Sequence, residues 1–288
     1  FYLRVNETQE DVLKVAKAIG VDRASDRGAV NELFNAKFSE ALKTVGKQFD
    51  FVQPQRLGAI VVPVGVREQR DGLAWILGHC GAKALLLDHG LVERVTAGDH
   101  PGLALVVCGA AEGALQPAGA LAYEDLLRHG AADVAEASPT PAAVAEEDVA
   151  AILYTSGTTG RPKGAMLTQL GIVHSVLHYI AAMGLTERDR SLLAVPATHV
   201  TGLIANVAAM VGAGGTLVLM PEFKAAAFLD LAEAERVTHT LMVPAMYKLL
   251  LLEPDFARRK LSAWRIGGFG GAPMPVATID ALAQVLPG

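Results

Sequence analysis

Short apolar stretches rich in β-branched residues alternate with segments of helical length from residue 59 onward. The stretches cover residues 59–64, 84–88, 103–109, 149–155, 191–196, 215–221, 239–244 and 264–271. Strands that are apolar throughout and separated by helices are typical of mainly parallel sheets covered by helices on both faces. The pattern therefore predicts an α/β fold.

Residues 131–148 interrupt this alternation. The stretch consists mostly of alanine, proline and acidic residues without an apolar period, and we interpret it as a solvated linker. It separates a first α/β subdomain portion, residues 51–130, from a second subdomain, residues 149–288.

The first fifty residues follow a different pattern. Apolar positions recur at helical spacing, with charges between them, in residues 7–21 and 28–49. We therefore predict a helical segment over residues 1–50, whose role the pattern does not indicate, and no strand before residue 59.

An uncharged run from Gly202 to Met220 is long enough to be a candidate membrane span. Glycines in its middle and the β-rich sequence after them favour a buried helix, a turn and a buried strand instead. We expect no transmembrane segment.

Composition narrows the possible classes of protein. The 288 residues are 51% hydrophobic with a net charge of -5, which is typical of a soluble globular protein. The 25 lysines and arginines are scattered, so a nucleic-acid partner is not expected. Cys80 and Cys108 lie in apolar runs, which favours two buried thiols, a reducing compartment and a cytoplasmic location over a disulfide or a zinc site. The oligomeric state is not indicated.

A polar, glycine-rich stretch, "YTSGTTGRPKG", begins at Tyr154, at the end of the predicted strand 149–155. Open α/β sheets bind ligands at the carboxyl ends of their strands, and glycine amides, hydroxyls and cations together suit a polyphosphate. The candidate ligand-binding residues are Thr155, Ser156, Gly157, Thr158, Thr159, Gly160 and Lys163. Their spacing fits neither a P-loop nor a dinucleotide fingerprint.

Lys163 is the strongest candidate in this stretch, because a hydrogen bond to a charged group contributes roughly 1.5–3 kcal/mol. A polar hairpin without a ligand, and for Lys163 a plain surface lysine, are the alternatives.

His199 follows the predicted strand 191–196 and could orient a carboxylate substrate, although a buried core histidine fits as well. His174 and His178 would share one helix face, but no third ligand is evident. We interpret them as ordinary helix residues and predict no metal-binding side chains.

Four residues after the last predicted strand could accept a flat base against the backbone, because little side chain stands in the way. They are Gly270, Gly271, Ala272 and Pro273. A tight strand-to-helix turn started by the prolines is the alternative, and both can hold together.

The stretch "LYTSGTTGRPKGAMLT" resembles the AMP-binding signature of the adenylate-forming superfamily, which includes acyl-CoA synthetases, luciferases and peptide-synthetase adenylation domains. Residues 56–64 with 81–88, 195–203 and 270–275 also agree with that family, in the same order. The resemblance covers the chain from about residue 51 to its end. It implies that the loop holds the β- and γ-phosphates of ATP, that the His199 stretch borders the acyl pocket, and that Gly270–Pro273 packs on adenine.

The implied activity is activation of a small carboxylic acid by ATP with Mg²⁺, followed by transfer to coenzyme A, with His199 and Lys163 in catalytic roles. The aliphatic residues 201–215 suggest an apolar acyl or aryl substrate. Later family motifs would follow Gly288, so we expect a truncated N-terminal part of such an enzyme that is inactive alone. The alternative is a non-catalytic binding or interaction module.

Overall fold

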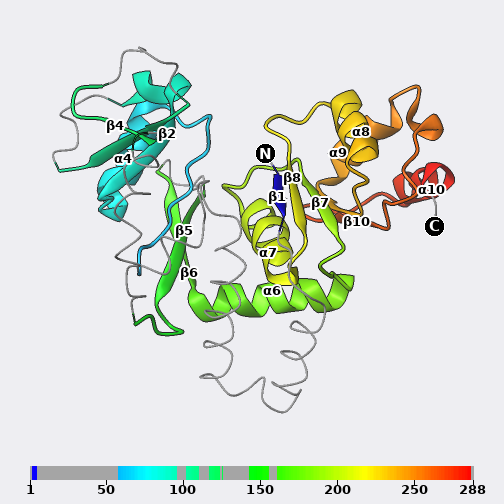
Figure 1. The fold of residues 1–288 in the computed structure, drawn as a ribbon, viewed down its shortest axis with the longest axis horizontal. Coiled ribbons are helices and arrows are strands. Elements are labelled where there is room, and N and C mark those ends of the chain that lie inside the picture. The colour runs from blue at the N-terminus through cyan, green and yellow to red at the C-terminus, as the bar shows by residue number, and fades with distance from the viewer. Residues whose placement is uncertain are drawn as a thin grey trace. The chain divides into compact units, whose positions relative to one another are not determined.

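The computed structural model describes residues 2–4, 58–95, 102–109, 117–123, 125, 143–155 and 161–286 (Figure 1). The predicted helices of residues 7–21 and 28–49, and most of the predicted linker, lie outside them. The chain divides into two compact units: unit 1 is Phe1–Gln53, Val144–Val149 and Leu167–Gly288, and unit 2 is Pro54–Ala143 and Ala150–Met166. These limits differ from the predicted boundaries at 131 and 149, which stay predictions.

Unit 1 is built on a five-stranded sheet. Its strands, in spatial order, are β1 (Tyr2–Arg4), β8 (Thr216–Leu219), β7 (Arg190–Leu193), β9 (His239–Met242) and β10 (Ile266–Phe269). The last four run parallel, as the apolar pattern predicts.

The prediction of no strand before residue 59 is wrong, because β1 pairs antiparallel with β8. A strand of three residues is too short to show a period of its own; what places it is the open edge of β8.

Helical segments connect the parallel strands, as parallel pairing requires. They are η2 (Thr201–Ala208), α7 (Ala209–Ala213), α8 (Ala225–Ala234), α9 (Pro244–Leu251) and η3 (Phe256–Arg258). Helix α6 (Gln169–Met183) precedes β7, and α10 (Val276–Val285) follows β10. In the core, the Trp264 ring lies 5.6 Å from that of Phe228 and 6.4 Å from that of Tyr247, and all three side chains are buried. These rings fix α8 and α9 against the strands they connect.

The run from Gly202 to Met220 folds as predicted. It forms η2 and α7, turns at Gly214 and enters β8, and most of its residues are buried. None of the described helices has the length and apolar character needed to cross a lipid bilayer.

Unit 2 contains a parallel sheet of β2 (Ala84–Asp88), β3 (Ala104–Cys108) and β4 (Leu121–Ala122), with α4 (Arg70–Cys80) and the short helix η1 (His89–Arg94). A second pair is formed by β5 (Val149–Thr155) and β6 (Lys163–Thr168). The strand predicted at 59–64 is reduced to one parallel bridge between Val61 and Ala151. Pro63 has no N–H to continue the ladder.

Both cysteines are half-buried, whereas the sequence predicts fully buried thiols. Cys80 ends α4, where its thiol lies 3.7 Å from the Leu77 carbonyl oxygen, and Cys108 ends β3. Their places at the ends of elements, and not in the middle, explain the partial exposure.

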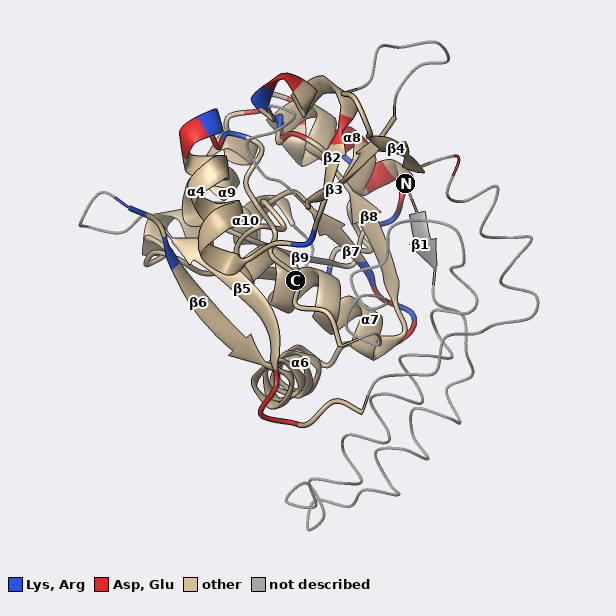
Figure 2. Ribbon diagram, turned by 90° about the vertical axis from the view of Figure 1, so that its left-hand side faces the viewer, with Lys and Arg blue, Asp and Glu red and all other residues tan. Residues whose placement is uncertain are grey.

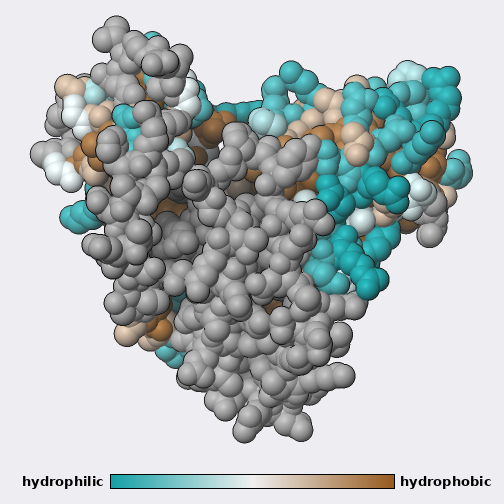
Figure 3. Space-filling model, in the orientation of Figure 1, coloured by the Kyte–Doolittle hydropathy of each residue, from teal (hydrophilic) through white to brown (hydrophobic). Residues whose placement is uncertain are grey.

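Charges of both signs lie close together along the described ribbon (Figure 2). In the face shown in Figure 3, hydrophilic residues cover much of the described surface around α8 and α9, with apolar residues between them.

Candidate functional site

The structure brings Thr155 and Lys163 together at the two ends of the β5–β6 connection. The Thr155 hydroxyl donates to the Lys163 carbonyl oxygen over 3.5 Å. The connection is too short for a parallel crossover, so the strands form a hairpin. The predicted residues between them, Ser156, Gly157, Thr158, Thr159 and Gly160, lie outside the described residues.

The Lys163 side chain is exposed at the start of β6. No ion pair of Lys163 occurs within the described parts of the chain, in contrast to Arg259, which pairs with Asp230 and Asp255. The ammonium group is therefore available to an anion such as a phosphate.

His199 is exposed in the loop between β7 and η2, so the interpretation of this residue as a buried core histidine is wrong. Its backbone is fixed at both ends: the His199 amide donates to the Pro196 carbonyl over 3.3 Å, and the His199 carbonyl accepts from Leu203 over 2.9 Å. A Cβ on Gly202 would collide with the Pro196 carbonyl oxygen. Only glycine lets η2 pack this closely on the loop that carries His199.

The segment η2 is π-helical, with each backbone bond spanning one residue more than in an α-helix. Asn206, fully buried, supports it: its amide group donates to the Thr201 carbonyl over 2.8 Å, and its Oδ1 accepts from the Ser191 hydroxyl over 3.3 Å. Sequence reasoning missed Asn206. The signal was available, because a single amide stands in the apolar run 202–213.

His239 continues this buried network on β9. Its Nδ1 lies 2.9 Å from the Ser191 hydroxyl and its Nε2 lies 3.2 Å from the Met183 sulfur. Burial lowers the pKa of His239 to about 4, with Asp189 acting in the opposite direction. The imidazole is therefore neutral at pH 7, and the network links β7, β9 and η2 without a charge.

Asp189 anchors the start of β7. Both of its carboxylate oxygens bind the Arg265 guanidinium, at 2.6 and 3.0 Å, and it also accepts from Thr238 and Thr186. Burial alone would raise the pKa of Asp189, but the hydrogen bonds from Arg265, Thr238 and Thr186 hold this pKa below its usual value.

The Gly270–Pro273 segment directly follows β10. The Gly270 amide donates to the Met242 carbonyl over 3.2 Å, and α10 begins at Val276 after Pro275. Residues 270–275 therefore connect β10 to α10, in the place that the turn interpretation gives them. A Cβ at Gly270 would meet nothing within 4 Å, so open space remains beside this backbone for a flat ligand.

His199 and the Gly270–Pro273 segment lie at the same edge of the unit 1 sheet. Each follows the carboxyl end of its strand, β7 or β10, and only β9 separates these parallel strands. Two strand spacings correspond to about 10 Å. Ligands of open α/β sheets bind at this kind of edge.

Metal ligands do not gather in the described residues, where no group of three or more His, Cys, Asp or Glu side chains could hold an ion. His174 and His178 are exposed on α6 with their rings 6.2 Å apart.

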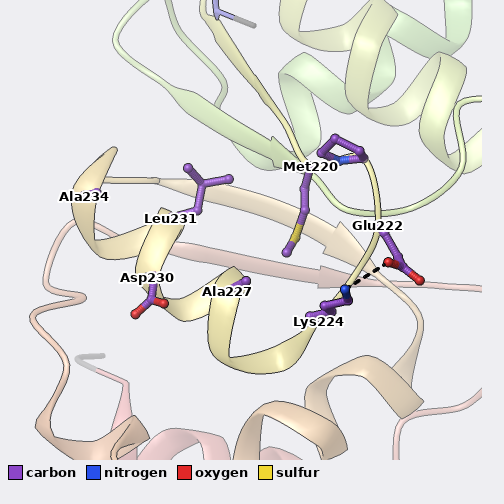
Figure 4. A pocket seen from close by; sticks show the side chains of 8 residues that line it. Met220, Glu222, Lys224, Ala227, Asp230, Leu231 and Ala234 are labelled. Atoms are coloured by element: carbon purple, nitrogen blue, oxygen red, sulfur yellow. Dashed lines mark ion pairs between the residues drawn. The ribbon is translucent and has the colours of Figure 1, made fainter.

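A hollow of ≈ 550 Å³ lies beside α8 (Figure 4) and is lined mainly by apolar surface. The Lys224 ammonium pairs with Glu222 at 3.2 Å on its rim. Its lining residues are Met220, Pro221, Glu222, Lys224, Ala227, Asp230, Leu231 and Ala234. None of the predicted site residues lines it.

The sequence matches the model of the family described as AMP-binding enzyme over residues 55–288. The chain belongs to the AMP-binding enzyme family. This match covers both β5 and β6, the His199 loop and the segment after β10, which are the regions that the resemblance singles out.

Two curated AMP-binding relatives are ligases that use coenzyme A. The chain is 33% identical over 220 residues to indoleacetate–CoA ligase of Aromatoleum aromaticum, covering 76% of this chain and 42% of that protein. It is 30% identical over 237 residues to long-chain-fatty-acid–CoA ligase FadD13 of Mycobacterium tuberculosis, covering 81% and 44%. The chain thus spans somewhat less than half the length of these relatives.

A solved structure confirms the predicted adenylate-forming fold. The anthranilate CoA ligase AuaEII in complex with anthranoyl-AMP superimposes with a TM-score of 0.70 at 22% identity, over 99% of this chain and 58% of that one. The predicted α/β class, with mainly parallel sheets covered by helices, therefore holds for this member of the AMP-binding family.

Proposed function

We propose that the protein takes part in ATP-dependent activation of a carboxylic acid. A carboxylate oxygen attacks the α-phosphorus of ATP, the bond to the bridging oxygen breaks, and pyrophosphate leaves with the electron pair. The products are an acyl-adenylate and pyrophosphate. Because both reactants are anionic, positioning and neutralisation of charge would supply most of the rate enhancement.

The observation that carries this proposal is the exposed ammonium of Lys163, unpaired within the described residues, directly after the hydroxyl-rich connection. It suits a phosphate group. Within unit 1, the open backbone at Gly270 suits a flat base, and the exposed His199 suits a carboxylate.

The second half of the proposed reaction is transfer of the acyl group to coenzyme A. The thiolate attacks the acyl carbon, and AMP leaves with the electrons of the mixed anhydride bond. This step is supported by the coenzyme A ligases among the relatives. Their named substrates, an indole acid and long-chain fatty acids, define the first acids to test.

Pyrophosphate exchange into ATP, measured with aromatic and fatty acids, tests the proposal. The assay is run on this chain and on a chain extended to the length of its relatives. In the extended chain we expect exchange that depends on the acid, and a decrease of ten- to a hundredfold for Lys163→Ala with an unchanged melting temperature, because an exposed side chain adds little to stability. Lys83→Ala, at another exposed lysine of unit 2, is the matched control. Thioester formation is measured separately with coenzyme A. Absence of exchange by the extended chain with every acid would contradict the proposal and would favour a non-catalytic binding module.

A further inference from the structure

Two side chains of α4 contact both ends of the β5–β6 hairpin connection. Trp75 and His79 are one helical turn apart, and their rings stack with centroids 5.1 Å apart. Neither residue belongs to the glycine-rich stretch. Helix α4 and both ends of the connection lie in unit 2.

His79 holds the strand that leads into the connection. Its Nδ1 lies 2.6 Å from the Tyr154 hydroxyl, and the two rings meet edge to face at 5.8 Å. Tyr154 directly precedes Thr155. Burial, and to a lesser extent Cys80, raises the pKa of Tyr154, so its hydroxyl keeps its proton at neutral pH.

Trp75 holds the other end, where the chain enters β6. Its indole Nε1 donates to the Pro162 carbonyl over 3.4 Å. The Arg161 guanidinium carbon lies 4.5 Å from the centre of the Trp75 ring, a cation–π distance. The Arg161 charge is thereby engaged, whereas Lys163, two residues on, has no ion pair within the described residues and can bind a ligand.

The two ends also pack on each other through Gly164. A Cβ at this position would lie 2.6 Å from the Ile152 Cγ2 atom and 3.3 Å from the Tyr154 ring. The Tyr154 ring that His79 binds therefore lies against the backbone next to Lys163. A displacement of the Tyr154 ring would therefore also displace the backbone next to Lys163.

We propose that Trp75 and His79 are positioning residues, which hold Tyr154 and the Arg161–Pro162 turn so that Thr155 and Lys163 present a fixed phosphate-binding geometry. This inference rests on the proposed function for the identity of the ligand. The contacts themselves do not depend on it. Neither residue touches the phosphates; each acts through the hairpin.

Hydrogen exchange of the protein tests the positioning without any ligand. We expect faster exchange of backbone amides in residues 152–155 and 163–167 for His79→Ala. His79→Asn should restore much of the protection, because its side-chain amide can form a hydrogen bond with the Tyr154 hydroxyl in place of Nδ1. Asp71→Asn, an exposed position on the same helix, should change nothing. Equal exchange in His79→Ala and the parent would overturn the inference.

Binding of inorganic tripolyphosphate, measured by calorimetry, tests the consequence for phosphates. We expect the affinity to fall about five- to tenfold for His79→Ala and for Tyr154→Phe, the effect of about one hydrogen bond. The double variant should lose no more than either single one, because both remove the same contact. Faster exchange with unchanged tripolyphosphate affinity, or no binding by the parent protein, would overturn the inference.

The same variants separate this inference from the proposed function. In pyrophosphate exchange by the chain extended to the length of its relatives, we expect a raised KM for ATP with an unchanged KM for the acid, whereas general destabilisation would lower the melting temperature and affect both. If the unsubstituted protein binds tripolyphosphate and responds to His79→Ala but the extended chain catalyses no exchange, the proposed function fails and the positioning stands.

Discussion

His199 is held by its backbone while its side chain stays exposed. The hydrogen bonds at Pro196 and Leu203 fix the loop, and neither uses the imidazole. A substitution of this side chain should therefore have little effect on the fold. Any loss of activity can then be attributed to the imidazole itself.

At this residue we predict that, in the chain extended to the length of its relatives, His199→Ala slows adenylate formation about a hundredfold, as is typical of losing one positioned polar group. The free energy of unfolding should change by less than about 0.5 kcal/mol, because the side chain is exposed. The rate of pyrophosphate exchange and the free energy of unfolding in urea, measured on one preparation with His174→Ala as control, check the two expectations. An unchanged rate would remove His199 from the site.

Some residues of the candidate site can be predicted from the sequence, and others cannot. The exposed cation Lys163 was predictable, because the hydroxyls and glycines before it have few uses other than anion binding. Trp75 and His79 were not, because their spacing on α4 is also that of a core-facing stripe. Their partners are 75 to 87 residues away in the sequence, and no local pattern carries that information.

Among the elements, η2 departs most from what a sequence can predict. The buried helix, turn and strand of the run 202–220 were predictable from glycines and hydrophobicity. The π-helical bonding was not, because it depends on the amide of Asn206 finding the Thr201 carbonyl and the Ser191 hydroxyl.

At the scale of this element we predict that Asn206→Ala lowers the free energy of unfolding by about 1–3 kcal/mol. The buried Thr201 carbonyl and Ser191 hydroxyl would each lose a partner. Urea unfolding checks the value, with His178→Ala on the exposed face of α6 as control. A loss below about 0.5 kcal/mol would show that η2 does not depend on this amide.

Some strands are likewise predictable from the sequence, and one is not. Strands β2 and β5 have the bounds predicted, because each consists mainly of a continuous apolar run, although β5 is mostly buried and β2 is largely exposed. In contrast, β6 was missed: it begins with Lys163 and Gly164, and Met166 in its middle is 69% exposed. Without a continuous apolar run, a strand leaves no hydrophobic signal in the sequence.

At the scale of the whole molecule, two buried titratable groups link stability to pH in different ranges. In the folded protein the pKa of His239 is about 4, below the ordinary value of 6.5. Between these two pH values the imidazole is protonated in the unfolded chain and neutral in the folded protein. The folded pKa of Asp189 lies below the ordinary value of 3.8. Both groups therefore stabilise the fold at neutral pH and lose that contribution on acidification.

We predict that the free energy of unfolding falls as the pH is lowered from about 6.5 to about 4, by on the order of 3 kcal/mol from His239. Asp189 adds a further loss below its unfolded value. Urea unfolding at several pH values checks this prediction. We expect His239→Gln to reduce the pH dependence of the free energy of unfolding between about pH 6.5 and about pH 4, and Asp189→Asn to reduce it at lower pH. If His239→Gln kept the parental slope over the upper range, another group would be responsible.

Within the described residues, strand β10 pairs on one side only, with β9. The four residues of β10, Ile266–Phe269, carry no charge and no proline, and Phe269 is 46% exposed. Charges and prolines are the usual protection of a strand against pairing with another chain. These four residues therefore present no barrier to the addition of a further strand, either from a continuation of the same chain or from another molecule.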